Sequence, residues 1–84
     1  MSNLPISHWK NITYCIEKIR EVWPSSILDV GVGYGRWGVL CREFLDVCRG
    51  DYDKNDWKTR IDGIEIFQNY LRPYHDYFYD RIIV

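Results

Sequence analysis

Four glycines and a neighbouring aspartate are the residues of this chain whose types and spacing point first to chemistry. They occupy the run from Ile27 to Gly38, in which an apolar segment containing Asp29 leads into Gly31, Gly33, Gly35 and Gly38. Glycine tolerates positive φ and leaves bare backbone for a ligand to approach. The amides at the start of a following helix would point towards that ligand. The run therefore predicts a buried strand, a ligand-binding loop and a helix.

Two glycine patterns overlap in this loop and predict different ligands. Gly31, Gly33 and Gly35 form G-x-G-x-G, whereas Gly33, Gly35 and Gly38 form the G-x-G-x-x-G of dinucleotide sites. A dinucleotide would bring a doubly negative pyrophosphate close to Asp29. S-adenosylmethionine (SAM) carries an ammonium and a sulfonium and no phosphate, so the carboxylate favours SAM. A nicotinamide site, and a turn that only lets the helix pack closely on the strand, are the alternatives.

A second carboxylate, Glu65, falls at the carboxyl end of the next predicted strand, residues 61–67. Parallel α/β folds bind their ligands at this end of the strands. A carboxylate there can accept hydrogen bonds from both hydroxyls of a ribose. Ile66, with Phe67 as the second choice, would then form an apolar wall against adenine. A surface glutamate that ends a strand is the alternative without a ligand.

The remaining pattern places helices and loops around these strands. Apolar residues recur at three- and four-residue steps over residues 7–23 and 36–48, which predicts two amphipathic helices, the first capped by Ser7. The charged segment 46–60 is predicted to be an exposed loop with a solvated surface. Pro73 is expected to start a short helix, and residues 82–84 to begin a third strand.

Composition and charge exclude several classes of function. The 84 residues, 46% hydrophobic and 27% charged, correspond to one small globular domain rather than a disordered tail. The net charge of −1 gives no electrostatic support for binding nucleic acid or an anionic membrane. No apolar run is long enough for a membrane span, so we expect a cytoplasmic protein.

The cysteines and aromatic residues are predicted to be structural. Cys15, Cys41 and Cys48 form no C-x-x-C motif and fall mainly in predicted helices, so we expect small buried hydrophobes without a disulfide or a metal. Six aromatic residues between positions 67 and 79 are expected to belong to the core. His75 and Asp76 are neighbours in sequence, which on a helix predicts neither a catalytic pair nor a metal site.

The sequence as a whole resembles the N-terminal part of a class I SAM-dependent methyltransferase domain. Residues 28–35, Leu-Asp-Val-Gly-Val-Gly-Tyr-Gly, are similar to the first motif of that family, and residues 36–38, 42–45 and 60–65 look like a bacterial and phage group of these enzymes. The resemblance implies a Rossmann-like, three-layer α/β fold. It would be incomplete here, with three parallel strands in the order 3-2-1 and covering helices, and would stop after the start of the third strand.

The same resemblance implies roles for the residues of the loop and strand ends. Asp29 would engage the methionine end of SAM, which Gly31, Gly33 and Gly35 would line. Glu65 would hold the ribose. The family's later strands carry its catalytic and acceptor-binding residues and would lie beyond this chain, so no catalytic residue and no methyl acceptor is assigned.

From this incomplete domain we expect three properties of the 84-residue chain. It should not methylate anything alone, it should bind SAM weakly at best, and it should either self-associate through the open edge of its first strand or need a longer polypeptide. The alternatives to a methyltransferase part are a fragment of an NAD(P)-dependent oxidoreductase and a non-catalytic, truncated module.

Overall fold

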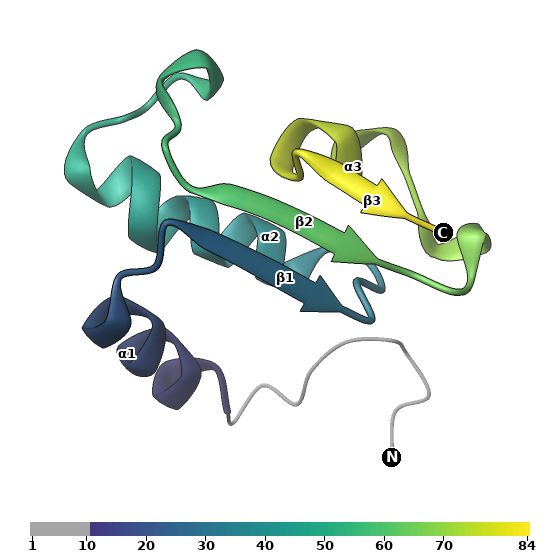
Figure 1. Ribbon diagram of the computed structural model, residues 1–84, viewed down its shortest axis with the longest axis horizontal. Coiled ribbons are helices and arrows are strands. Elements are labelled where there is room, and N and C mark those ends of the chain that lie inside the picture. The colour runs from purple at the N-terminus through teal and green to yellow at the C-terminus, as the bar shows by residue number, and fades with distance from the viewer. Residues whose placement is uncertain (1–10) are drawn as a thin grey trace.

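The computed structural model describes residues 11–84, which form a small α/β arrangement with three parallel strands in one open sheet (Figure 1). The strands are β1 (Ser26–Val30), β2 (Arg60–Ile64) and β3 (Arg81–Ile83). β2 lies in the middle and pairs in parallel with both neighbours. This confirms the predicted strand order and direction.

The helices lie between and before the strands. They are α1 (Ile12–Val22), α2 (Arg36–Cys41) and α3 (Pro73–Phe78). α2 continues directly into a π-helical turn (Arg42–Asp46) and a 3-10 turn (Val47–Arg49), and further 3-10 turns span Lys54–Asp56 and Gln68–Tyr70. Within residues 11–84 no helix has the length and apolar character needed to cross a bilayer.

The ends of the helices follow simple sequence signals. α3 begins at Pro73, as predicted, because proline fits the first turn of a helix. α1 ends where Trp23 turns into the left-handed region with φ 49°, directly before Pro24. The predicted start of this helix at residue 7, with its Ser7 cap, lies outside the described residues.

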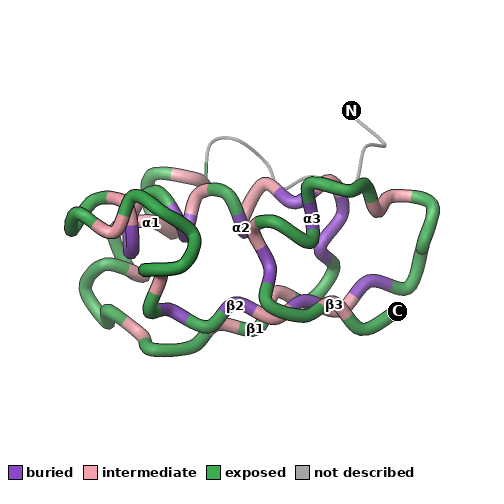
Figure 2. Tube along the Cα trace, turned by 90° about the horizontal axis from the view of Figure 1, so that it is seen from above, coloured by how far each residue is buried: buried purple, intermediate pink, exposed green. Residues whose placement is uncertain are grey.

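All three helices lie on the same side of the sheet (Figure 2). On the opposite side, Leu28 is 57% and Val30 is 73% exposed, so no described residue covers that face of β1. The prediction that β1 is a buried strand is therefore wrong for these two residues among those described. The described residues therefore form two layers. The third layer of the expected fold is not among them.

The core lies between the helices and the inner face of the sheet. Its buried apolar residues are Val32, Cys41, Leu45, Ile61 and Tyr79. Two glycines make room for this packing: a Cβ at Gly38 would lie 2.3 Å from the Tyr79 ring, and one at Gly63 would lie 2.3 Å from Val32. The neighbour that requires glycine at position 38 is therefore the ring of Tyr79.

The π-helical turn changes which residues face inwards. It directs Arg42 and Asp46 into the interior, and Asp46 is fully buried. The prediction of a solvated surface is therefore wrong for Asp46. Cys48 is exposed, so the prediction that it is buried is also wrong, because the regular helical stripe does not continue through the extra residue of a π turn.

The aromatic run between residues 67 and 79 is only partly in the core. Tyr79 is buried and Phe78 packs against the core, but Phe67, Tyr74 and Tyr77 are exposed. The prediction that these rings belong to the core is therefore wrong for those three. Trp57, in contrast, packs onto the domain, stacked on Phe78 at a centroid distance of 6.2 Å.

Candidate functional site

The loop between β1 and α2 contains three consecutive glycines of the motif in the left-handed region. Gly31, Gly33 and Gly35 have φ values of 80°, 58° and 89°. At Gly35, which precedes α2, an added Cβ would also lie 3.2 Å from the His75 ring, so both the backbone conformation and the neighbouring ring favour glycine. The loop follows the carboxyl end of β1, as the sequence predicts.

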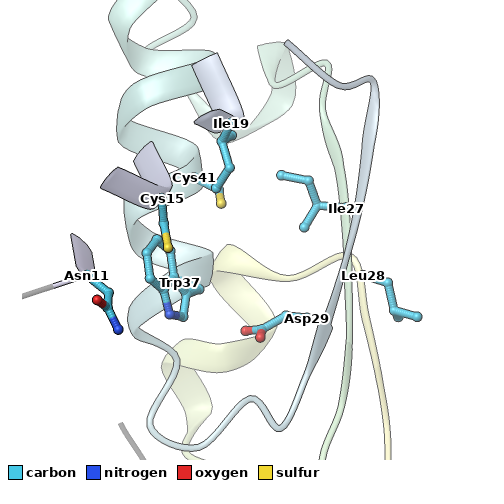
Figure 3. A pocket seen from close by; sticks show the side chains of 8 residues that line it. All are labelled: Asn11, Cys15, Ile19, Ile27, Leu28, Asp29, Trp37 and Cys41. Carbon is cyan, nitrogen blue, oxygen red and sulfur yellow. The ribbon is translucent and has the colours of Figure 1, made fainter. Parts of the chain in front are cut away.

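Asp29 points to the helix side of the sheet. Figure 3 shows its carboxyl group and Ile27 directed towards α2, whereas Leu28 points away. Tyr79 donates its hydroxyl hydrogen to Asp29 Oδ2 over 2.6 Å, and the Tyr79 oxygen accepts from the backbone N–H of Gly38 at 3.0 Å. Burial raises the pKa of Asp29, the hydrogen bond from Tyr79 lowers it, and the charge of Glu65 raises it further, so the net direction is upwards.

A pocket of about 320 Å³ lies between α1, β1 and α2. Figure 3 shows the residues that line it: Asn11, Cys15, Ile19, Ile27, Leu28, Asp29, Trp37 and Cys41. Burial raises the pKa of Cys41 to about 11, so its thiol is neutral at pH 7. Of the described residues that line the pocket, Asp29 alone carries a carboxyl group, and its surroundings are mainly apolar.

Glu65 directly follows β2 and braces the glycine loop. Its Oε1 accepts a hydrogen bond from the Gly33 amide at 2.6 Å, and its Oε2 accepts one from the Phe67 amide at 2.9 Å. The residue is 5% exposed and does not line the pocket that contains Asp29. A carboxylate has about four lone-pair positions, so these two bonds leave acceptor capacity at Glu65.

The structure therefore brings together most, but not all, of the residues predicted to form the site. The glycine loop, with Gly33 and Gly35, lies at the carboxyl ends of β1 and β2 beside Asp29 and Glu65. Gly31 belongs to the same region and donates its amide hydrogen to Ile64 O at 2.8 Å. Ile66, the predicted adenine wall, is 80% exposed and does not line the pocket. Its role stays a prediction.

The sequence interpretation missed two residues of the site. Tyr79 holds Asp29, and His75 is 1% exposed with its Nε2 3.0 Å from the carbonyl oxygen of Gly33. Both lie more than 40 positions from their partners, so no local spacing connects them. The unusual glycine in α2, Gly38, was the one available signal, because it indicates a close neighbour without identifying Tyr79.

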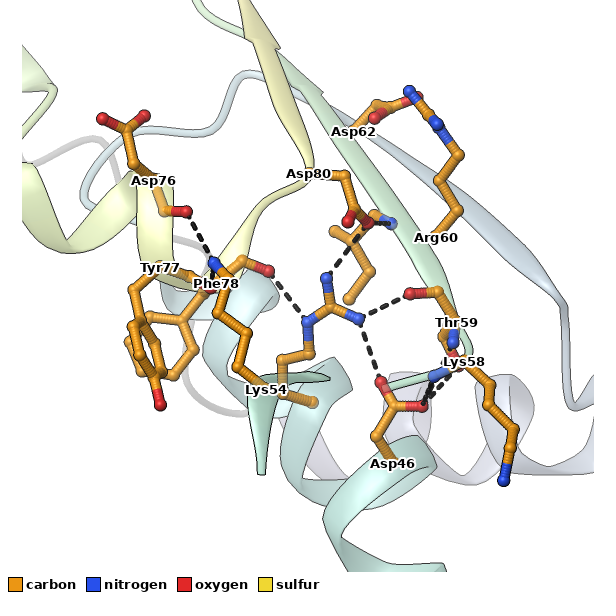
Figure 4. A network of polar contacts seen from close by, with 12 residues as sticks. Asp46, Lys54, Lys58, Thr59, Arg60, Asp62, Asp76, Tyr77, Phe78 and Asp80 are labelled. Atoms are coloured by element: carbon orange, nitrogen blue, oxygen red, sulfur yellow. Dashed lines mark hydrogen bonds and ion pairs between the residues drawn. The ribbon is translucent and has the colours of Figure 1, made fainter. Parts of the chain in front are cut away.

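A second polar cluster lies at the amino ends of β2 and β3 (Figure 4). Arg42 donates to Asp46 at 3.0 Å, to Asp80 at 3.1 Å and to the carbonyl oxygens of Thr59 and Phe78. Asp46 also accepts from the amide and the hydroxyl of Thr59. Burial would raise the pKa of Asp46, but the hydrogen bonds from Arg42 and its other donors outweigh it and lower the pKa. The charges of Arg42, Asp46 and Asp80 are therefore paired with one another.

Comparisons of the chain with models of known protein families, with curated proteins and with solved structures found no match. Within residues 11–84, no group of three or more His, Cys, Asp or Glu side chains is arranged to hold a metal ion. The functional assignment therefore depends on the glycine loop, its two carboxylates and the pocket.

Proposed function

We propose that this chain binds SAM at the carboxyl ends of β1 and β2 and supplies the cofactor-binding part of a SAM-dependent methyltransferase. The observation that carries the proposal is the setting of Asp29. This carboxylate lines a largely apolar pocket, and among residues 11–84 no lysine or arginine forms an ion pair with it or with Glu65. A half-buried carboxylate without a cation favours a ligand that brings one, and the methionine end of SAM carries an ammonium beside a sulfonium.

The residues present fit such a ligand in three respects. The pocket of about 320 Å³ is in the range of about 300–1,000 Å³ common for small-molecule sites. The loop with Gly31, Gly33 and Gly35 lets a ligand approach the backbone closely. Glu65 keeps lone pairs for ribose hydroxyls. When bound, SAM supplies the electrophilic methyl group, and the part of the protein is to position it for in-line transfer.

A dinucleotide is less compatible with the same site. Its pyrophosphate would meet the carboxylates of Asp29 and Glu65, which are already close enough for the charge of one to raise the pKa of the other. No described residue adds a positive charge to that pair through an ion pair. Stabilisation by NAD in the binding test below would indicate an NAD(P) site instead.

The proposal is tested by ligand binding to the 84-residue chain. We expect SAM at high concentration to raise the midpoint of thermal unfolding, and NAD at the same concentration to leave it unchanged. A footprint identifies the place: SAM should slow alkylation of Cys15, which lines the pocket, but not of the exposed Cys48. Stabilisation by NAD without stabilisation by SAM, or equal alkylation of Cys15 with and without SAM, would contradict the proposal.

A further inference from the structure

The segment after the second strand packs against the glycine loop and holds two consecutive carbonyl groups of it. His75 Nε2 lies 3.0 Å from Gly33 O, and the Tyr74 hydroxyl donates to Tyr34 O over 2.6 Å. The two donors are neighbours on α3, and so are the two acceptors on the loop. One short helix therefore fixes two successive peptide groups of the loop.

The hydrogen bonds of His75 define its tautomer. His75 Nδ1 lies 2.8 Å from the backbone nitrogen of Arg72, which donates its hydrogen to it, and 3.1 Å from the carbonyl oxygen of Arg72. Gly33 O, 3.0 Å from Nε2, can only accept a hydrogen bond, so these contacts together fit a ring that accepts at Nδ1. The proton of a neutral imidazole is then on Nε2, where it is donated to Gly33 O. The ring is 1% exposed and stacks on Tyr74 at a centroid distance of 4.6 Å, so its orientation is fixed by packing as well.

Gly33 is consequently held from both sides. Its amide donates to Glu65 Oε1 at 2.6 Å, and its carbonyl accepts from His75. In a planar trans peptide the C=O and the next N–H point in opposite directions. With Gly33 O directed at His75, the N–H of Tyr34 is directed to the other side of the loop, away from α3.

We infer that His75 is a positioning residue that sets the orientation of the Gly33–Tyr34 peptide for ligand binding. The identity of the ligand as SAM rests on the proposed function, whereas the orientation of the loop rests on the hydrogen bonds of Gly33. Glu65 and His75 act on the same glycine from β2 and α3, so the loop presents one backbone arrangement before a ligand arrives. Such preorganisation strengthens binding because the loop need not be ordered during association.

Two substitutions of His75 separate positioning from simple packing. His75→Gln places a side-chain N–H near the former Nε2 and can keep the bond to Gly33. His75→Asn keeps an acceptor for the Arg72 amide but is too short to reach Gly33. Both remove the aromatic ring and its stacking on Tyr74, so they form a matched pair for the loss of packing.

We expect the two variants to differ in the loop and in affinity. In a 15N-labelled chain, the Tyr34 and Gly35 amide signals should stay near the wild-type positions in His75→Gln and move in His75→Asn. The affinity for SAM should fall about five- to tenfold in His75→Asn, the effect of one neutral hydrogen bond, and remain within about twofold of the wild type in His75→Gln. Tyr74→Phe, at an exposed position, should move the Gly35 signal with a smaller loss of affinity.

The outcomes separate this inference from the proposed function. If the wild type does not bind SAM, the proposed function fails, and the Tyr34 and Gly35 signals alone decide the role of His75. If the two His75 variants give the same amide signals, whether wild-type-like or equally displaced, the positioning role is overturned. Equal losses of SAM affinity in both variants, in proportion to their loss of stability, would also overturn it.

Discussion

The two ends of the sheet contain acidic side chains in opposite electrostatic settings. At the amino ends of β2 and β3, Asp46 and Asp80 both accept hydrogen bonds from the buried guanidinium of Arg42. At the carboxyl ends of β1 and β2, Asp29 and Glu65 accept hydrogen bonds from a tyrosine hydroxyl and from backbone amides, which are neutral donors. The first end neutralises its charges through ion pairs, whereas among residues 11–84 no ion pair forms with the carboxylates of the second end.

This difference separates stability from ligand binding. Hydrogen bonds from Arg42 and other donors outweigh burial and lower the pKa of Asp46, so the ionised form stabilises the fold. Burial raises the pKa of Asp29, so its ionised form is unfavourable in the folded chain. A cationic ligand would reverse the second effect and has no role in the first. Substitutions at the two ends should therefore have different consequences.

The largest effect is expected for Asp46→Asn. It leaves the guanidinium of Arg42 with only the partly exposed Asp80 as an anionic partner. Losing one member of a buried ion pair costs about 3–5 kcal/mol. Chemical denaturation should show this loss in the free energy of unfolding, and Asp53→Asn, at an exposed position, is the control.

Low pH should destabilise the fold through the same residue, because it protonates Asp46. Because the folded-state pKa of Asp46 is lowered, its contribution to stability is present above its ordinary pKa and is lost as the pH falls towards the folded value. The stability of Asp46→Asn should therefore depend less on pH in this acidic range than that of the wild type. An unfolding free energy within about 1 kcal/mol of the wild type at pH 7 would contradict the account of this cluster.

Glu65→Ala should have the next largest effect, on ligand binding. It removes the acceptor that holds the Gly33 amide and the proposed ribose partner. We expect the affinity for SAM to weaken by about 1.5–3 kcal/mol, the range for hydrogen bonds to a charged group. Calorimetry measures this change, and Glu43→Ala, an exposed glutamate on the π-helical turn, is the control. An unchanged affinity would remove Glu65 from the site.

Gly38→Ala tests the packing that connects α2 with the residue that holds Asp29. The added Cβ would lie 2.3 Å from the Tyr79 ring, so the ring or the helix must move. Overpacking of this kind costs about 1–3 kcal/mol, partly offset by the higher helix propensity of alanine. Thermal unfolding should show a lower midpoint. A midpoint equal to that of the wild type would mean that α2 and Tyr79 are less closely packed than this 2.3 Å distance requires.

The smallest change in stability is expected for Asp29→Asn. A raised folded-state pKa means that stability from this group is fully present below its ordinary pKa and is lost as the pH rises through the folded value. At pH 7 the neutral amide avoids that loss, so the variant should be as stable as the wild type or more stable by up to about 1 kcal/mol. Destabilisation by more than about 1 kcal/mol would show that the ionised carboxylate supports the fold.

The elements around the loop were predictable because their signals are local. The apolar run of β1, the glycines that follow it and Pro73 at the start of α3 each determine the nearby backbone. The proximity of Asp29 and Glu65 could also be predicted, because both residues lie near the carboxyl ends of neighbouring parallel strands, and these ends meet at the same edge of a sheet.

The rest depends on contacts between distant parts of the chain. A regular helical repeat places Asp46 in the solvated segment, and only the π-helical turn directs it to Arg42 and Thr59. Tyr79 reaches Asp29 across 50 positions, and His75 reaches Gly33 across 42. Such pairs have no signature in a single sequence, because each partner alone has the pattern of an ordinary core residue.

Asp29, which forms no ion pair with a lysine or arginine among residues 11–84, is proposed to bind the cationic end of SAM. Titrating SAM into the 15N-labelled chain and into Asp29→Asn tests this proposal most directly. The account predicts that SAM moves the amide signals of Gly31, Gly33 and Gly35 in the wild type. It predicts that the apparent affinity falls at least about tenfold in Asp29→Asn, although the variant is as stable as the wild type. Unmoved glycine signals in the wild type, or equal affinity in the two proteins, would contradict it.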